Sequence, residues 1–354
     1  METSVSTKSK NSASTVEDML GERITAETHP EGYPTFVRPR LAGGFPDAAS
    51  FRHWLIEREQ QLDELLSEVG AIVFRGFPIH GTTDFGALID HYPSDAMGYS
   101  GGAATRSNIA GKVFEATRMP ADMKLPLHQE MAYLPRWPAK LAFYCHVAAE
   151  EGGATIIADV RRFEKLVAEK LLTELRQRGI QYRRNFRAPG PFVRALTETH
   201  RTWQEVFYTE DRAKAEADCA AMGVEAIWED DGSLTTIYTA PGFLDHPQTG
   251  ERHWFNHLQS MTVTPYSIGK VWDIYRETYR GGIKPPYDIR FGDGSPIPLD
   301  DVLDLFPKLD SVTVAFPWQA GDMMLVDNII MMHGRDPYKG QREIQVALLW
   351  GKAA

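Results

Sequence analysis

The chain has 354 residues, of which 43% are hydrophobic and 11% aromatic, enough to bury the core of one large domain or two average ones. Its formal net charge of −10 argues against nucleic-acid binding as the main role, because that role needs clustered Lys and Arg. No run of about 18 apolar residues occurs, and the N-terminus lacks the apolar segment of a signal peptide, so we expect no membrane span and no secretion. The two cysteines, Cys145 and Cys219, show no disulfide or metal spacing, which favours a cytoplasmic protein with Cys145 in the core.

In chain order, residues 1–15 are rich in Ser, Thr and Lys, and we expect a disordered tail there before a single domain over 16–354. Apolar spacing predicts one helix from Ala48 to Val69 and further helices over 160–177 and 268–279. Runs of strand-forming residues predict strands at 71–74, 113–117, 140–147, 154–159, 313–316, 323–326 and 343–350. Residues 182–250 are long, polar and mixed, and we predict an insertion that covers the site.

Many short strands with Gly and Pro turns, and only a few helices, predict a mainly β fold with flanking helices, either a sandwich or a jelly roll. There is no alternating strand–helix rhythm and no glycine-rich phosphate loop. Nucleotide binding on those scaffolds is therefore not expected.

A histidine and a carboxylate stand two residues apart in Leu125-Pro126-Leu127-His128-Gln129-Glu130-Met131. On an extended strand, side chains at i and i+2 project from the same face, so we expect His128 and Glu130 to point at one place. An imidazole and a carboxylate are two of the three ligands in the two-His-one-carboxylate site of non-haem Fe(II) proteins. A half-exposed strand with a solvated Glu is the alternative.

The third ligand is expected to be His333, which follows a predicted buried strand in Met331-Met332-His333-Gly334-Arg335. A rigid strand end suits a metal ligand, although a core histidine with a backbone partner has the same setting.

Arg342 opens the last predicted strand, and a buried Arg needs a carboxylate partner. In a 2-oxoglutarate oxygenase that partner is the distal carboxylate of the co-substrate, held by the guanidinium fork with help from a hydroxyl that Thr155 can supply. A surface Arg paired with Glu343, and an ordinary strand Thr, are the alternatives.

Taken together and in this order, the motifs resemble those of the taurine dioxygenase (TauD/TfdA) superfamily of Fe(II)/2-oxoglutarate oxygenases. The chain is most similar to the subgroup of the syringomycin-pathway protein SyrP, with clavaminate-synthase-like enzymes as relatives. The resemblance runs from about Gly70 to Gly351 and is carried by segments 73–77, 99–103, 128–133, 152–155, 246–251, 254–257 and 333–338.

The resemblance implies a double-stranded β-helix of the cupin-like jelly-roll type. It implies Fe(II) on His128, Glu130 and His333, and 2-oxoglutarate on Thr155 and Arg342. It also implies an enzyme, a dioxygenase that uses O2 to hydroxylate an unactivated C–H of an amino acid or amino-acid-derived small molecule in natural product biosynthesis. A peptidyl carrier protein that tethers the substrate is one partner the subgroup suggests.

Position in the family pattern suggests substrate contacts from one set of residues: Tyr99, Ser100, Arg106, Gln129, Tyr133, Arg184, Asn185 and Asn256. Three departures leave the substrate open. Gln129 stands where the subgroup often has Asn, Glu343 where it often has a second Arg, and Val346 where many relatives have an Arg that contacts substrate or co-substrate.

Desaturation or cyclisation at the same iron, a non-catalytic metal and 2-oxoglutarate sensor, and a zinc hydrolase remain alternatives. The predicted Thr155–Arg342 clamp disfavours the hydrolase, which has no use for it. The sequence leaves the substrate, the carbon oxidised and the oligomeric state open, with a homo-oligomer among the alternatives.

Overall fold

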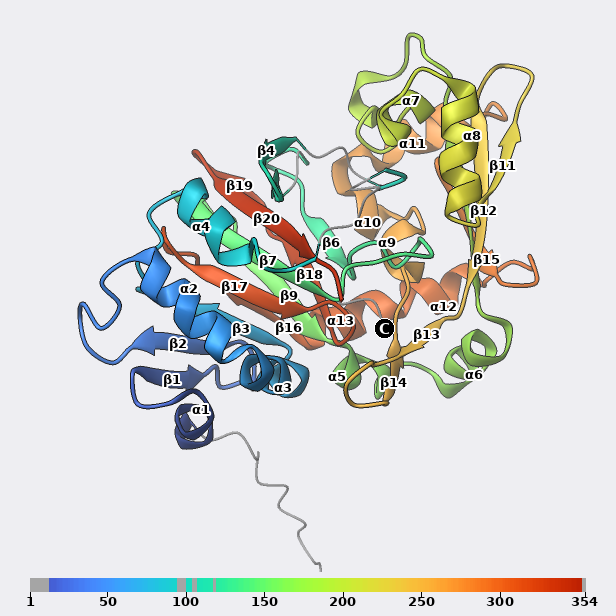
Figure 1. The fold of residues 1–354 in the computed structure, drawn as a ribbon. Coiled ribbons are helices and arrows are strands. Elements are labelled where there is room, and N and C mark those ends of the chain that lie inside the picture. The colour runs from blue at the N-terminus through green and yellow to red at the C-terminus, as the bar shows by residue number, and fades with distance from the viewer. Residues whose placement is uncertain (1–12, 94–99, 104–106, 117–118, 352–354) are drawn as a thin grey trace, which may run out of the picture.

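The computed structural model describes residues 13–93, 100–103, 107–116 and 119–351. Its centre is a pair of facing β-sheets (Figure 1). The larger sheet has eight strands in the order β1 (Ile24–Thr28), β2 (Thr35–Pro39), β3 (Ala71–Phe74), β17 (Met323–Asp327), β7 (Lys140–Val147), β20 (Glu343–Leu349), β5 (Val113–Glu115) and β4 (Asn108–Ala110). The smaller has the order β16 (Thr313–Phe316), β9 (Thr155–Asp159), β18 (Met331–Arg335) and β6 (Leu125–His128).

Period-two alternation in the large sheet explains its two cores. In β7, Leu141, Phe143 and Cys145 face the smaller sheet, whereas Ala142 and Tyr144 face the opposite side. The opposite side is covered by α1 (Ala13–Leu20), α2 (Ala48–Glu57), α3 (Glu59–Val69) and α4 (Thr82–Ile89), the blue and cyan helices of Figure 1. The predicted mainly β jelly roll with flanking helices is therefore confirmed.

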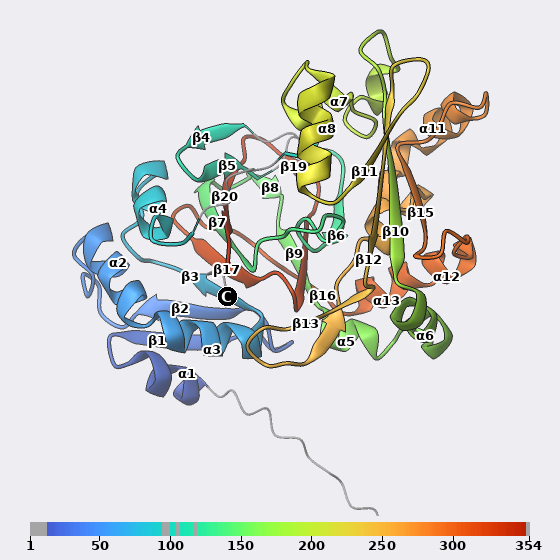
Figure 2. The same ribbon diagram turned by 45° about the vertical axis from the view of Figure 1, so that its right-hand side comes forward.

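A second layer of structure stands beside the jelly roll, and we call residues 180–291 the lid (Figure 2). Its sheet has the order β11 (Glu225–Trp228), β12 (Leu234–Ala240), β10 (Ile180–Phe186) and β15 (Tyr287–Phe291), and a hairpin joins β13 (Phe243–Asp245) to β14 (Arg252–Trp254). Its helices are η1 (Arg194–Leu196), α7 (Trp203–Phe207), α8 (Arg212–Ala221), α9 (Leu258–Met261), α10 (Pro265–Ile268), η2 (Gly269–Val271) and α11 (Trp272–Tyr279). The predicted insertion over 182–250 is thus too short, because β15 completes its sheet only at 287–291.

The remaining elements connect these layers. They are α5 (Val160–Glu164), α6 (Glu169–Arg178), α12 (Leu299–Leu303), α13 (Leu305–Ser311) and the strand pair β8 (Glu151–Gly152) with β19 (Tyr338–Lys339).

Several element boundaries differ from the prediction. The helix expected over 268–279 divides into η2 and α11. The helix expected over 48–69 breaks at Arg58 into α2 and α3, and the helix expected over 160–177 is interrupted between α5 and α6. The predicted tail over 1–15 overlaps α1, which begins at Ala13, and residues 1–12 lie outside the described residues. Among the described residues, no helix combines the length and apolar character that a membrane span requires.

Candidate metal centre and substrate cavity

His128, Glu130 and His333 converge at the edge of the smaller sheet. His128 ends β6 and lies directly opposite His333 of β18 in the strand register. The Glu130 carboxylate lies 3.9 Å from Nε2 of His128 and 3.8 Å from Nε2 of His333. The sequence therefore selected three residues that the fold brings together.

The route by which Glu130 reaches this point differs from the prediction. The strand ends at His128, and Glu130 lies in the following turn, where Met131 has a φ of 60°. The two side chains meet because the backbone turns, and the expectation that they share one face of a strand is wrong.

Neighbouring side chains hold this turn in place. The Asn328 side chain accepts a hydrogen bond from the Glu130 backbone N–H at 2.7 Å and donates one to its carbonyl oxygen at 2.9 Å. The buried Gln129 amide donates to the carbonyl oxygens of Trp254 and Ile329. These hydrogen bonds fix the backbone on both sides of the Glu130 side chain. Glu130 is only 2% exposed, so its carboxylate is held inside the site.

The donor set fits a divalent metal ion. Nδ1 of His128 lies 2.8 Å from the Pro126 carbonyl oxygen, so the ring donates from Nδ1 and leaves Nε2 as the acceptor. The three ligand atoms lie within 4.8 Å of one another. Ligands about 2.1 Å from a shared metal in neighbouring octahedral positions would be on the order of 3 Å apart, so a small inward movement suffices.

A recess beside the two histidines contains the predicted clamp. It is lined by His128, His333, Thr155, Arg335 and Arg342, together with Ala116, Leu125, Phe143, Gly334 and Ile344. Thr155 accepts a hydrogen bond from the indole of Trp318 at 2.8 Å, which leaves its own hydroxyl hydrogen available to donate.

Arg342 points into this recess without an acidic partner. Its Nε donates to the Gly153 carbonyl oxygen at 2.9 Å, and in the described part of the chain no carboxylate lies within 4.0 Å of its guanidinium. Burial, with a smaller contribution from the nearby Arg335, lowers the pKa of Arg342 to about 10. Arg342 is therefore a cation at neutral pH in a setting that a bound carboxylate would complete.

Arg335 is a second cation in the same recess, and sequence reasoning gave it no role. It is 3% exposed and donates to the carbonyl oxygens of Met119, Pro120 and Met123. Arg335 and Arg342 lie over the ring of Tyr338, at 5.0 and 5.6 Å from its centroid. Arg335 thereby ties the segment before β6 to the wall of the recess.

A second cavity, of about 160 Å³, opens from the candidate metal ligands His128 and Glu130 towards the lid. It shares Ala116, Leu125 and His128 with the recess, so the two spaces meet at His128. Its other described lining residues are Ala103, Met119, Pro126, Glu130, Tyr133, Glu198, Thr199, Arg201, His257, Ser260, Met261, Val263, Ser267, Ile268 and Tyr287. We call this space the substrate cavity.

Of the predicted substrate contacts, Tyr133 lines this cavity. Its hydroxyl accepts a hydrogen bond from the Ala103 N–H, and burial raises the pKa of the phenol to about 12. Tyr99 and Arg106 lie outside the described residues.

The other predicted contacts do not line the substrate cavity. Gln129 and Asn256 bind backbone groups, Ser100 donates to Asp218, and Asn185 bonds to Pro285 and Thr235. Arg184 donates to the carbonyl oxygens of Gly101 and Gly102 and lies over the Tyr133 ring at 4.7 Å. Arg184 and Asn185 line a small neighbouring recess that shares Ala103, Thr199, Arg201 and Tyr287 with the substrate cavity. Direct contact of these side chains with the substrate stays a prediction.

His257, Glu198 and Arg201 line the cavity and were missed. His257 Nε2 donates to the Gln129 carbonyl oxygen while Nδ1 accepts from Ser260 at 3.0 Å, and burial lowers its pKa to about 3, so the ring is neutral. The segment Trp254-Phe255-Asn256-His257 signalled this residue, because it belongs to the family resemblance. No sequence signal marked Glu198 or Arg201, which lie in irregular chain.

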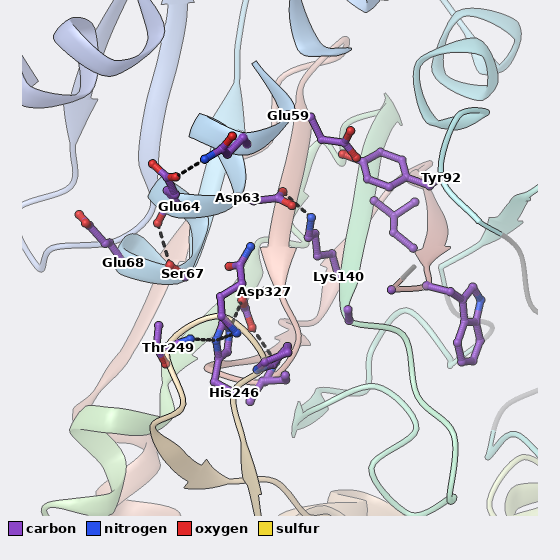
Figure 3. Close-up of a pocket in the computed structure, with 18 of the residues that line it drawn as sticks. Glu59, Asp63, Glu64, Ser67, Glu68, Tyr92, Lys140, His246, Thr249 and Asp327 are labelled. Carbon is purple, nitrogen blue, oxygen red and sulfur yellow. Dashed lines mark hydrogen bonds and ion pairs between the residues drawn. The ribbon is translucent and has the colours of Figure 1, made fainter. Parts of the chain in front are cut away.

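A larger cavity of about 940 Å³ lies elsewhere, against α3 (Figure 3), and its described lining includes none of the three candidate metal ligands. His246 and Asp327 form a buried pair at its wall, 2.9 Å apart, and Asp327 also accepts from the Ile329 N–H at 2.8 Å. This pair anchors the turn that leads to His333. The candidate metal centre lies at the substrate cavity and not at this larger one.

The sequence matches the family model described as "Taurine catabolism dioxygenase TauD, TfdA family" over residues 41–348. The chain belongs to the TauD/TfdA family. It is 34% identical to the dapdiamide synthesis protein DdaC of Enterobacter agglomerans over 81% of this chain and 84% of that protein. It is 32% identical to a clavaminate synthase-like protein of Arabidopsis thaliana over 94% and 98% of the two chains.

Solved structures show the same fold at low sequence identity. The structure of AAD-2 with Mn(II) and N-oxalylglycine covers 94% of this chain, and 99% of that chain is matched, with a TM-score of 0.50 and 11% identity. Family membership makes this protein an Fe(II)/2-oxoglutarate-dependent dioxygenase, and its donor set and recess fit that metal and co-substrate.

Proposed function

We propose that this TauD/TfdA enzyme hydroxylates an unactivated C–H bond of an amino acid or an amino-acid-derived small molecule in specialised metabolism. His128, Glu130 and His333 are the proposed iron ligands, and Thr155 and Arg342 the proposed 2-oxoglutarate clamp. The observation that carries the proposal is the meeting of two spaces at His128. One holds the half-buried guanidinium of Arg342, which has no carboxylate partner among the described residues, and the other opens to the lid.

Iron and 2-oxoglutarate, when bound, supply the oxidative decarboxylation by O2 that yields succinate and CO2 and oxidises a C–H bond. The side chains supply binding, orientation and exclusion of water. Arg342 can bind the distal carboxylate of the co-substrate with its guanidinium fork, and the Thr155 hydroxyl can donate to the same group. Apolar side chains such as Met119, Met261 and Ile268 enclose the substrate.

The size of the substrate cavity favours a small molecule. Its volume of about 160 Å³ is below the range of about 300–1,000 Å³ usual for drug-sized ligands. The similarity to a dapdiamide synthesis protein supports a substrate related to amino acids in a biosynthetic pathway. A substrate tethered to a peptidyl carrier would place its reactive end in the same space and its carrier outside.

Mass spectrometry of amino acids, free and carrier-bound, after incubation with enzyme, Fe(II), 2-oxoglutarate and O2 tests the proposal. We expect one product that has gained one oxygen, with matching succinate. Loss of two hydrogens would instead show desaturation or cyclisation, and binding of 2-oxoglutarate without turnover of any candidate would contradict the catalytic proposal.

Glu130→Ala should abolish the product, because it removes the carboxylate ligand. Glu151→Ala is the matched control, since Glu151 is exposed, pairs with Lys339 and lines neither the recess nor the substrate cavity. Equal turnover by Glu130→Ala and the control would show that Glu130 does not hold the metal.

A further inference from the structure

Two opposite charges stand at the lid end of the substrate cavity. Apart from the metal ligand Glu130, Glu198 is the one carboxylate among its described lining residues, and Arg201 is the one guanidinium there. Both come from the short lid segment between η1 and α7. The remaining described lining between them and the metal ligands is largely apolar, with Leu125, Met119 and Met261 among its members.

Arg201 is held in place by the elements on either side of it. Its backbone carbonyl accepts a hydrogen bond from the Arg187 N–H at 3.1 Å. The next residue, Thr202, caps α7 in a reciprocal capping box with Glu205. The Arg201 residue is 8% exposed, so its guanidinium is presented to the cavity from a fixed backbone and is largely removed from water.

Glu198 lies three residues earlier and closer to solvent. One terminal nitrogen of Arg201 forms an ion pair with its carboxylate, whose side chain is 44% exposed. A guanidinium has five N–H donors in a planar fork, and the buried Nε of Arg201 has no hydrogen-bond partner in the described part of the chain, so the fork keeps a donor for a second carboxylate. The partly exposed Glu198 can turn to a cation without leaving the cavity.

We propose that Glu198 and Arg201 form a head-group subsite for a free α-amino acid, with Arg201 binding the carboxylate and Glu198 the ammonium group. This inference rests on the proposed function and names its substrate class. The side chain of the amino acid then extends past the apolar walls to the metal ligands. A zwitterion between the two residues gives each charge an opposite partner.

Other head groups fit this pair less well. An N-acylated amino acid brings a carboxylate beside Glu198 without the ammonium that would balance it. An aminoacyl group on a carrier is a thioester, so it offers no carboxylate and leaves Arg201 without that partner. The subsite therefore selects the free amino acid over the carrier-bound form.

Equilibrium dialysis of the full-length enzyme tests this inference without turnover. The enzyme is loaded with Mn(II) and N-oxalylglycine under argon and dialysed against a mixture of the twenty protein L-amino acids, quantified by mass spectrometry. Parallel mixtures of their carboxamides and N-acetyl derivatives lack the carboxylate or the ammonium group. We expect at least one free amino acid to be retained. The affinity of the enzyme for each of its two derivatives should be lower by at least about 10-fold.

Substitutions in the pair should change retention in a graded way. Arg201→Met should weaken binding of the retained amino acid about 10- to 100-fold, Arg201→Lys less, and Glu198→Gln about 3- to 10-fold because Glu198 is partly exposed. Arg194→Met is the matched control, because Arg194 is an exposed arginine of η1, next to this lid segment, and is not among the described residues that line the cavity. Melting temperatures and N-oxalylglycine binding show whether each variant is folded.

Several results would overturn the subsite. The subsite is refuted if the enzyme retains no free amino acid, or if it retains amino acids and their carboxamides equally. It is also refuted if folded Arg201→Met and Arg201→Lys retain the amino acid as well as the wild type does. Oxidation of a carrier-bound aminoacyl group, with no binding of free amino acids, would also overturn it while leaving the oxygenase function intact. The two proposals therefore fail on different measurements.

Discussion

Replacing Arg342 with methionine should weaken 2-oxoglutarate binding by at least about 10-fold. Each charge-assisted hydrogen bond to the guanidinium is worth about 1.5–3 kcal/mol, which corresponds to a factor of roughly 10 to 150 in affinity. The recess strengthens this expectation, because the described residues place no carboxylate within 4.0 Å of Arg342 and a bound carboxylate would be its counter-charge.

Arg342→Met weakens 2-oxoglutarate binding but should not lower the free energy of unfolding of the protein without ligand. Partial burial of a cation that has no acidic partner among the described residues costs stability, so an unbranched apolar side chain of similar length should leave the free energy of unfolding unchanged or raise it. Saturation with 2-oxoglutarate at 100 times the wild-type Kd should stabilise the wild type by about 2.7 kcal/mol. With a 30-fold higher Kd, the same concentration would stabilise Arg342→Met by only about 0.9 kcal/mol.

Two measurements on the anaerobic Fe(II) protein check this. Titration with 2-oxoglutarate, followed by the visible charge-transfer band, gives the Kd, and denaturant unfolding with and without 2-oxoglutarate gives the stabilisation. Lys339→Met is the control, because Lys339 is an exposed cation three residues away that pairs with Glu151. A Kd within threefold of the wild-type value would refute the assignment of the clamp to Arg342.

Three further outcomes follow from the site and the lid. Asn328→Ala removes both hydrogen bonds that fix the Glu130 backbone, so metal titration should show about 10- to 100-fold weaker binding, and unchanged affinity would contradict this support. Gly334→Ala would put a Cβ 2.5 Å from the Leu125 carbonyl oxygen in β6, and we expect about 1–3 kcal/mol lower stability in denaturant unfolding together with weaker metal binding. Burial lowers the pKa of His200 from 6.5 to about 4, so the unfolded chain takes up this proton first and stability is lost as pH falls through that window. This residue should contribute a loss of roughly 2 kcal/mol between pH 7 and pH 5, and His200→Gln should reduce the fall, whereas equal pH profiles would refute the effect.

The sequence by itself predicted a mainly β fold, and the family resemblance of its motifs implied the jelly roll and the three residues of the candidate metal centre. Strands such as β3, β7 and β16 were predicted at their observed bounds, because each is a short run of strand-forming residues that local sequence reveals. His128, Glu130 and His333 were selected by spacing, setting and order along the chain. These features are local, so they are readable before the chain folds.

Tertiary structure alone decided how those residues meet and what surrounds them. Glu130 reaches the metal centre through a turn held by Asn328, a contact across 198 positions that no local pattern encodes. The lid extends to β15, and its irregular segment carries Glu198 and Arg201 to the cavity. Long irregular segments have no periodicity to report which side chains face inward, because their course is set by contacts with distant strands and helices.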